Sequence, residues 1–390
     1  MNDKMPAGMA EATRLTRAGR LTEAAALIQR LLSGGSADAP PPAASGGTVI
    51  EGEAVRLGER DMPRPEAEAK PARKPAPKAA PKARKGLRET LAGLAARAAR
   101  PQPAPEPLPE GASFLTGTYA EAAGRRDYKL YVPSGRAGQR LPLVVMLHGC
   151  TQSPDDFAAG TRMNALAEEF GLLVAYPAQP QSANPQKCWN WFNPADQGRG
   201  RGEPALLAGI VMQIMRDHAV DQERVYIAGL SAGGAAAAIM GAAYPELFAA
   251  VGVHSGLPAG AAHDVQSAFA AMRQGAAPAR RGGRAVPTIV FHGDRDATVN
   301  PRNGEAVVAH ALAGAKAPAA RTERGRAPGG HGYARTLHAD PSGRVVCEHW
   351  TVEGAGHAWM GGSAAGSYTD PRGPDASREM LRFFMEHKVG

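Results

Sequence analysis

The sequence has few aromatic residues and few cysteines, and it has no long apolar run. Aromatic residues make up 5% of the 390 residues, and three cysteines are present. No stretch approaches the roughly 20 apolar residues of a transmembrane helix. The N-terminus does not read as a secretory signal peptide, because no basic segment precedes an unbroken apolar one. The cysteines and histidines lack metal-ligand spacing, and no glycine-rich loop fits a dinucleotide. We therefore expect no transmembrane segment, no metal and no cofactor.

The first 112 residues differ in composition from the remainder. Helical spacing of apolar residues predicts a helical segment over residues 1–32, which packs on its own protein or anchors a partner or surface. Residues 33–112 are rich in Ala, Pro, Gly, Ser and charge, which predicts a disordered linker. Within it, residues 70–100 hold ten Lys or Arg and one acid, against a net charge of +8 for the whole chain. Residues 1–112 are thus either a solvated spacer or a contact to a granule surface or polyanion.

Beyond residue 112, short apolar or β-branched runs alternate with helical ones. This alternation predicts an α/β domain over residues 113–390, with a mostly parallel sheet and helices on both faces. We expect strands at residues 127–133, 141–147, 172–176, 225–228, 250–253, 288–291 and 345–352. We expect helices near residues 155–170, 203–219, 231–243, 303–313 and 375–387. Functional residues should then gather at the carboxyl ends of the strands.

Three of the predicted strand ends carry the parts of a catalytic triad. Ser231 lies in Gly-Leu-Ser-Ala-Gly, a sharp strand-to-helix turn that requires small neighbours. A serine hydroxyl is a weak nucleophile unless a histidine accepts its proton and a carboxylate orients that histidine. Asp296 and His357 follow Ser231 in the chain order of α/β-hydrolase folds. We therefore predict that fold and a triad of Ser231, Asp296 and His357, with Asp294 as a second candidate for the carboxylate.

Attack by a serine nucleophile on a carbonyl also needs two fixed N–H donors that stabilise the oxyanion. One donor should be the amide of Ala232, directly after the nucleophile. The other follows His148-Gly149 and is most simply the amide of Cys150. A donor of this kind contributes about 3 to 4 kcal/mol of transition-state stabilisation.

Five stretches together resemble one enzyme family. They are Leu-His-Gly-Cys-Thr-Gln, Cys-Trp-Asn-Trp-Phe, Gly-Leu-Ser-Ala-Gly-Gly, His-Gly-x-x-Asp-x-x-Val and Gly-x-Gly-His-Ala-Trp, between residues 147 and 359. This set is similar to the signatures of the poly(3-hydroxybutyrate) depolymerase family of esterases, whose relatives include feruloyl and acetylxylan esterases. The resemblance implies Ser231 as nucleophile, His357 as base and Asp296 as its orienter. It also implies cleavage of esters of hydroxy acids or of plant-wall acids.

The resemblance further implies that Cys150 and Cys188 meet near the site. A disulfide between them would require an oxidising compartment. The compartment stays open, since the missing signal peptide favours the cytoplasm and the family favours an extracellular enzyme. Three cysteines leave at least one thiol unpaired, and Cys347, in a predicted strand, is expected to be buried and inert.

Three tryptophans and one long segment are expected near the site. Trp189, Trp191 and Trp359 fall in loops at its edge, where they contact substrate or cover apolar surface. Residues 254–286 interrupt the strand rhythm and could form a cap. We expect a serine ester hydrolase acting on poly(3-hydroxybutyrate) or its oligomers. The alternatives are a feruloyl or acetylxylan-type esterase and, in a different class, a binding protein tethered to a granule or polyanion with weak esterase activity.

Overall fold

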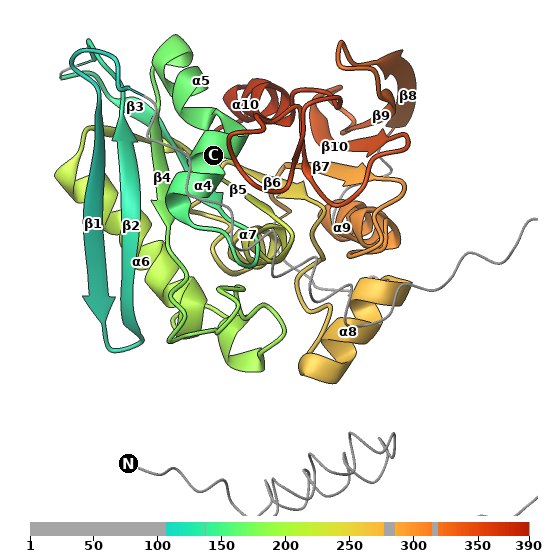
Figure 1. The fold of residues 1–390 in the computed structure, drawn as a ribbon, viewed down its shortest axis with the longest axis horizontal. Helices are drawn as coiled ribbons and strands as arrows, with labels where there is room; N and C mark the ends of the chain where they lie inside the picture. Colours follow the sequence, from blue (N-terminus) through green and yellow to red (C-terminus); the bar gives the residue numbers. More distant parts are fainter. Residues whose placement is uncertain (1–106, 137, 277–284, 314–318, 390) are drawn as a thin grey trace, which may run out of the picture. The chain divides into compact units, whose positions relative to one another are not determined.

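The structure, a computed structural model, describes residues 107–136, 138–276, 285–313 and 319–389 (Figure 1). The expected helical segment at residues 1–32 lies outside these residues, as does the expected linker up to residue 106. The fold described below is therefore that of the predicted catalytic segment.

A ten-stranded sheet forms the centre of this segment, in the order β1-β2-β4-β3-β5-β6-β7-β10-β9-β8. Its strands are β1 Ser113–Glu121, β2 Gly124–Val132, β3 Leu141–Leu147, β4 Leu173–Pro177, β5 Val220–Leu230, β6 Ala250–His254, β7 Thr288–Gly293, β8 Ala319–Arg326, β9 Gly332–Ala339 and β10 Val345–Val352. The strands from β4 to β10 in this order are parallel to one another. The outer strands on both sides pair antiparallel. The carboxyl ends of the parallel strands therefore share one edge.

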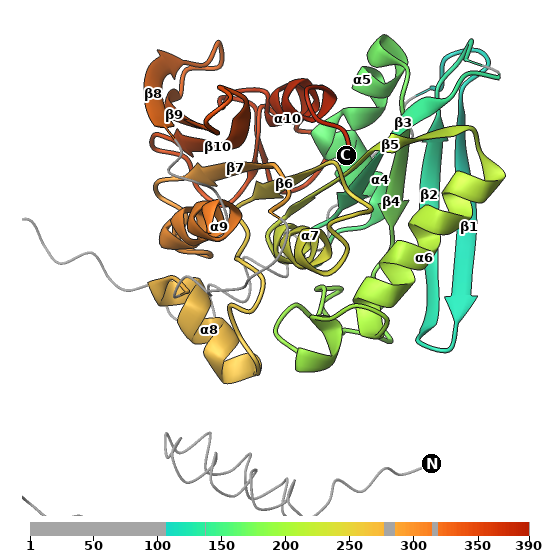
Figure 2. The ribbon, with the colours of Figure 1, turned by 180° about the vertical axis from the view of Figure 1, so that it is seen from behind.

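Helices cover both faces of the sheet (Figures 1 and 2). They are α4 Pro154–Thr161, α5 Met163–Phe170, α6 Gly202–Asp217, α7 Ala232–Ala243, α8 Val265–Gln274, α9 Arg302–Leu312 and α10 Ala376–Met385, with a 3₁₀ turn at Pro194–Asp196. One face packs against α4, α5 and α10, and the other against α6, α7 and α9, while α8 packs on α9. Within the described residues, none of these helices is both long enough and apolar enough to span a bilayer.

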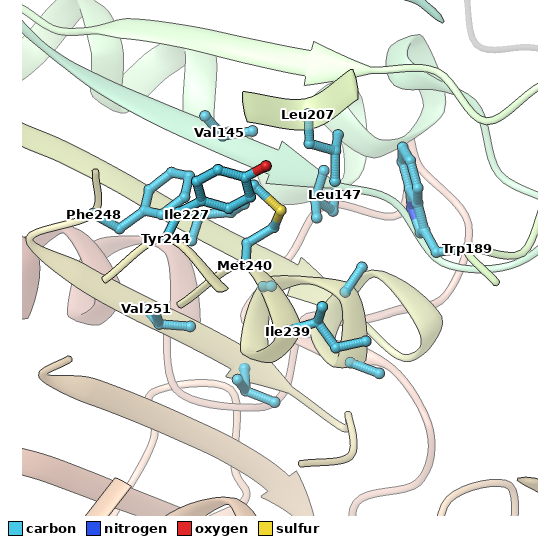
Figure 3. Close-up of a cluster of buried hydrophobic side chains, with 14 of the residues drawn as sticks. Val145, Leu147, Trp189, Leu207, Ile227, Ile239, Met240, Tyr244, Phe248 and Val251 are labelled. Atoms are coloured by element: carbon cyan, nitrogen blue, oxygen red, sulfur yellow. The ribbon is translucent and has the colours of Figure 1, made fainter. Parts of the chain in front are cut away.

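The continuous apolar run of β3 shows why both faces are covered. Side chains alternate along a strand, so Val145 and Leu147 point into one core cluster and Val144 and Met146 into the other. All seven residues of β3 are buried. Figure 3 shows Val145 and Leu147 packed with side chains of α6 and α7. Each fully buried aliphatic side chain of this kind stabilises the fold by about 1.5 to 3 kcal/mol.

The seven expected strands and five expected helical regions are confirmed, and the structure adds elements that were not expected. The helix expected near 155–170 is two helices, because Arg162 has a left-handed backbone with φ of 56°. Strands β1, β8 and β9 were not expected, and neither was a separate two-stranded sheet of β11 Trp359–Met360 and β12 Thr369–Asp370. β8, for example, is almost entirely exposed and carries Arg, Thr and Glu in place of an apolar pattern. α8 was also missed, because it buries only two alanines.

Candidate active site

The predicted catalytic residues follow neighbouring strands. Ser231 comes after β5, Asp296 after β7 and His357 after β10, while His254 is the last residue of β6. β5, β6, β7 and β10 are adjacent in this order, and β3 adjoins β5 on its other side. The topology thus brings these segments, together with the one that follows β3, to one edge of the sheet.

Ser231 occupies the sharp turn between β5 and α7. Its backbone has φ of 59° and ψ of −118°, a conformation that non-glycine residues rarely adopt. Its amide donates to His254 O at 2.9 Å, and its carbonyl accepts from Ala235 N at 3.0 Å. A Cβ at Gly229 would lie 2.8 Å from Leu147 O, and one at Gly233 would lie 2.6 Å from His148 O. The two glycines are therefore required because the turn is pressed against the end of β3.

His357 and Asp296 are joined by a short hydrogen bond. His357 Nδ1 lies 2.7 Å from Asp296 Oδ2. The Asp296 carboxylate is fully buried, and its Oδ1 accepts from the amides of Thr298 and Val299, each at 2.9 Å. Because a carboxylate only accepts, His357 carries its hydrogen on Nδ1, and Nε2 is the nitrogen left for a serine proton.

A second histidine contacts the same carboxylate. His292 Nε2 lies 3.4 Å from Asp296 Oδ2 and 2.9 Å from Val299 O. Burial alone would raise the pKa of Asp296, but hydrogen bonds from His292, His357 and the Val299 amide hold that pKa well below its usual range. Asp296 is therefore ionised across the neutral pH range.

Asp294, the second candidate, has a different environment. It is exposed, and its Oδ1 accepts from Gly354 N at 2.7 Å. Asp294 therefore supports the loop that leads to His357 but does not contact the imidazole.

The structure does not join the serine hydroxyl to the histidine. The Ser231 side chain makes no capping hydrogen bond to α7. Within the described part of the chain, no hydrogen bond links it to His357 either. Catalytic hydrogen bonds are commonly long in ligand-free enzymes and tighten when substrate binds.

The two predicted oxyanion donors lie at the same edge. Ala232 is the first residue of α7, and Cys150 directly follows the His148-Gly149 pair. In the described residues, neither amide donates to another backbone group. The turn around Cys150 is fixed on one side by Thr151, whose φ is 67° and whose amide donates to Gln186 O at 2.6 Å. Both amides are thus available to a ligand oxygen.

The side chain of His148 stabilises this turn by two hydrogen bonds. Its Nε2 accepts from Gln179 N at 3.1 Å and its Nδ1 donates to Gly149 O at 2.8 Å. Burial lowers the pKa of His148 to about 4. His148 therefore acts as a neutral bridge and is too well engaged to act as a base.

The sulfur atoms of Cys150 and Cys188 form a disulfide in the structure. It connects the turn after β3 to the loop between β4 and α6. Cys347 is a buried free thiol, and burial raises its pKa well above the ordinary value. A thiol with so little thiolate is inert.

Comparison with known proteins identifies the family. A family model described as esterase PHB depolymerase matches residues 126–321, just over half of the chain. The chain belongs to this family of esterases. The matched residues include Ser231 and Asp296, while His357 lies beyond them.

Individual relatives of this esterase family match parts of the chain. Poly(3-hydroxyalkanoate) depolymerase C of Paucimonas lemoignei is 34% identical over 245 residues, covering 58% of this chain and 57% of that protein. Feruloyl esterase B of Neurospora crassa is 34% identical over 128 residues, covering 33% and 42%. Acetylxylan esterase A of Aspergillus ficuum is 30% identical over 194 residues, covering 45% and 62%. The chain thus spans about half the length of the curated relatives it matches.

A solved structure supports the fold of this family member. Acetyl xylan esterase from Aspergillus awamori superposes with a TM-score of 0.55 at 22% identity, over 70% of this chain and 99% of that one. With the parallel sheet and its two helical layers, this likeness confirms the predicted α/β-hydrolase fold.

The three tryptophans do not lie at the surface of the site. Trp189 and Trp359 are 0% and 1% exposed, and Trp191 is 6% exposed. The Trp189 indole donates to His148 O at 3.0 Å, and the Trp359 indole donates to Ser377 Oγ at 3.0 Å. The structure thus places them as packing residues behind the loops of the site, the second of the two roles expected for them.

Sequence reasoning missed His254. It is 0% exposed and stacks on Trp359, with ring centroids 5.0 Å apart. Its carbonyl accepts from Ser231 N, and its Nε2 accepts from Met360 N at 3.0 Å. His254 therefore ties the serine turn to the segment that follows His357. A histidine that ends the strand next to that of the predicted nucleophile was the available signal.

Glu203 was also missed, because its partners come from distant loops. It is buried and accepts from the amide and the side chain of Asn190, each at 2.8 Å, and from Gln179 Nε2. Arg126 lies 3.5 Å away. Burial raises the pKa of Glu203 to about 7, and these hydrogen bonds only partly offset that effect. Because the amide of Gln179 also donates to His148, this cluster supports the turn that carries Cys150.

The expected cap at residues 254–286 contains α8. Its C-terminal end docks on the loop after Asp296, where Asn300 N donates to Met272 O at 2.7 Å. Residues 277–284 lie outside the described residues. Across the described ranges, no three His, Cys, Asp or Glu side chains gather in a way that could hold a metal ion.

Proposed function

We propose that this protein is a serine-dependent carboxylic ester hydrolase with Ser231 as nucleophile, His357 as base and Asp296 as the carboxylate that orients the base. The observation that carries the proposal is the 2.7 Å hydrogen bond between His357 Nδ1 and Asp296 Oδ2, at the sheet edge where Ser231 occupies its strained turn. Membership of an esterase family supports the same chemistry.

The reaction runs in two halves. Ser231 Oγ attacks the ester carbonyl carbon while His357 Nε2 takes the hydroxyl proton. The carbon–oxygen bond to the alcohol then breaks as His357 returns that proton to the leaving oxygen, which leaves an acyl ester on Ser231. Water attacks this ester, with His357 again accepting and returning a proton. The carboxylic acid leaves and Ser231 is restored.

The two amides and the Asp296 carboxylate stabilise the charges that develop during the reaction. The amides of Cys150 and Ala232 bind the oxygen that becomes negative in each half-reaction. Asp296 is ionised at neutral pH, so it stabilises the imidazolium that forms on His357 and holds Nδ1–H in place.

The proposed substrate is an ester of a 3-hydroxyalkanoate, as polymer or short oligomer. The poly(3-hydroxyalkanoate) depolymerase relative matches 58% of the chain, against 33% for the feruloyl esterase at the same identity. A feruloyl or acetyl ester of polysaccharide is the second candidate, favoured by relatives of 30 to 34% identity with those names.

The substrate is tested by offering purified protein hydroxybutyrate oligomers, methyl ferulate and acetylated xylan side by side and following acid release. Turnover that is highest on the oligomers supports the polyester assignment. Turnover of methyl ferulate or acetylated xylan alone would move the substrate to plant-wall esters and leave the mechanism unchanged. No acid release from any of the three would contradict the proposed hydrolase.

The basic tract suggests a tethering role for residues 1–112, which we propose contact a polyester granule or a polyanion. Ten Lys or Arg against one acid within residues 70–100 favour an anionic surface. Deleting residues 1–112 should abolish association with granules or DNA while turnover of a soluble ester stays intact. Association that survives the deletion would refute this role, and residues 113–390 would then make the contact with the granule or polyanion.

A further inference from the structure

Strained backbone gathers around the proposed site. Among the residues that the structure describes, six non-glycine residues have positive φ, namely Thr151, Arg162, Lys187, Ser231, Ser255 and Tyr368. The positive φ of Arg162 separates helices α4 and α5, and that of Ser231 forms the sharp turn of the proposed nucleophile. Of the remaining four, Thr151 and Tyr368, at 67° and 52°, approach each other through their hydroxyl oxygens. Residues held in sparsely populated conformations cluster at ligand-binding sites, so these two are candidates for a further role.

Tyr368 connects the two loops that carry the proposed chemistry. Its carbonyl accepts from Trp359 N at 2.6 Å, two residues beyond His357. Its hydroxyl lies 3.4 Å from Thr151 Oγ1, one residue beyond Cys150. The side chain therefore reaches from the segment that follows the base to the residue after the oxyanion donor.

The residue before Tyr368 fixes it in place. Ser367 N donates to Asp156 Oδ1 at 2.9 Å, and Ser367 O accepts from Gln152 Nε2 at 3.1 Å. Gln152 Oε1 in turn accepts from Gly149 N at 2.8 Å, within the oxyanion turn. Tyr368 is thus positioned before any ligand arrives.

The hydroxyl of Tyr368 makes only a long hydrogen bond. Thr151 has one hydroxyl proton, and it is donated to Cys150 O at 2.6 Å. Thr151 Oγ1 can then only accept from Tyr368, at a distance of 3.4 Å that is long for two oxygen atoms. Tyr368 is half-buried, so its O–H is a donor that a ligand oxygen can capture.

We propose that Tyr368 is a substrate-binding residue whose hydroxyl donates to a second oxygen of the substrate, the carbonyl or hydroxyl of the hydroxyacyl unit next to the scissile ester. This inference rests on the proposed esterase function. It requires a substrate with a further ester or hydroxyl oxygen about one unit from the reacting carbonyl, which hydroxyalkanoate oligomers supply and a simple acetate does not.

The test compares wild type with Tyr368→Phe on two substrates, a hydroxybutyrate trimer and p-nitrophenyl acetate. The variant deletes one hydroxyl and keeps the ring. A lost neutral hydrogen bond should raise KM for the trimer about three- to tenfold with kcat little changed. Both constants for p-nitrophenyl acetate should stay at the wild-type value. Tyr333→Phe, on β9, is the matched control and should leave all four constants unchanged.

The other outcomes separate the two claims. Equal constants for Tyr368→Phe and wild type on the trimer would overturn the Tyr368 contact and leave the esterase proposal standing. If Tyr368→Phe loses activity equally on both substrates, the Tyr368 contact is also overturned, because such a loss indicates a structural role. Wild-type protein that cleaves p-nitrophenyl acetate but not the trimer would contradict the polyester substrate, and the Tyr368 contact with it.

Discussion

At the residue scale, two aspartates two positions apart have different surroundings. Asp296 is buried and contacts His357 and His292, while Asp294 is exposed and supports Gly354. We expect Asp296→Asn to lower kcat about a thousandfold to ten-thousandfold, because the amide no longer fixes the tautomer of His357.

Asp294→Asn is the matched control for this prediction. Its side-chain oxygen can still accept from Gly354 N, so its steady-state kinetics on a soluble ester should remain within about threefold of wild type. A large loss in Asp294→Asn, with Asp296→Asn near wild type, would exchange the two assignments.

The raised pKa of Glu203 predicts that the free energy of unfolding depends on pH. Its pKa in the folded protein is about 7, above the ordinary value of 4.5, so folding favours the protonated form. The contribution of Glu203 to the free energy of unfolding is therefore fully present below pH 4.5 and is lost as the pH rises towards 7. Between pH 5 and pH 8, the free energy of unfolding should fall by about 2 to 3 kcal/mol more in wild type than in Glu203→Gln.

Urea denaturation of both proteins at the two pH values measures this difference. Parallel pH profiles would show that Glu203 does not titrate in this range, whatever the absolute stability of Glu203→Gln.

Residue chemistry could be anticipated from sequence where a motif encodes it locally. Asp296 and His357 follow strands directly, and strand ends meet at one edge. The burial of Trp189 could not be anticipated, because it depends on how the loop between β4 and α6 folds against His148, and local sequence does not specify that contact.

At the element scale, the turn between β5 and α7 depends on close backbone packing. A Cβ at Gly233 would collide with the backbone carbonyls of Leu147 and His148, which form the end of β3. Backbone cannot yield as a flexible side chain can. We expect Gly233→Ala to lower the free energy of unfolding by at least about 2 kcal/mol and to lower esterase activity.

Gly356→Ala is the control for stability. A Cβ at Gly356 would meet no atom within 4 Å, and its φ is not positive. Thermal unfolding should therefore place Gly356→Ala close to wild type and Gly233→Ala well below it. Equal melting temperatures for all three proteins would contradict the packing argument.

Secondary structure was predictable where burial imposes a pattern. The central strands are apolar on both faces, and the helices that flank them carry apolar stripes. β8 and β9 pair at the edge of the sheet, where most side chains are at least partly exposed, so their sequences carry no apolar alternation. Their pairing is set by the neighbouring β10, which is tertiary information.

At the scale of the whole molecule, the sheet order explains how distant segments form one site. Ser231, Asp296 and His357 are spread over more than a hundred residues, yet β5, β7 and β10 lie within four adjacent strands. The chain order of the proposed triad predicted this arrangement, because that order is typical of the α/β-hydrolase fold. The hydrogen bonds of His254 and Tyr368 join loops that are distant in the sequence, and these contacts became visible only in the structure.

The most direct test of the central claim is hydrolysis of hydroxybutyrate oligomers by wild type and by Ser231→Ala, followed as acid release under the same conditions. Removal of the nucleophile should reduce kcat by about a millionfold, to the limit of detection, while the melting temperature stays near that of wild type. Oligomer hydrolysis that persists in Ser231→Ala at a rate comparable to wild type would contradict the assignment of Ser231 and the mechanism built on it.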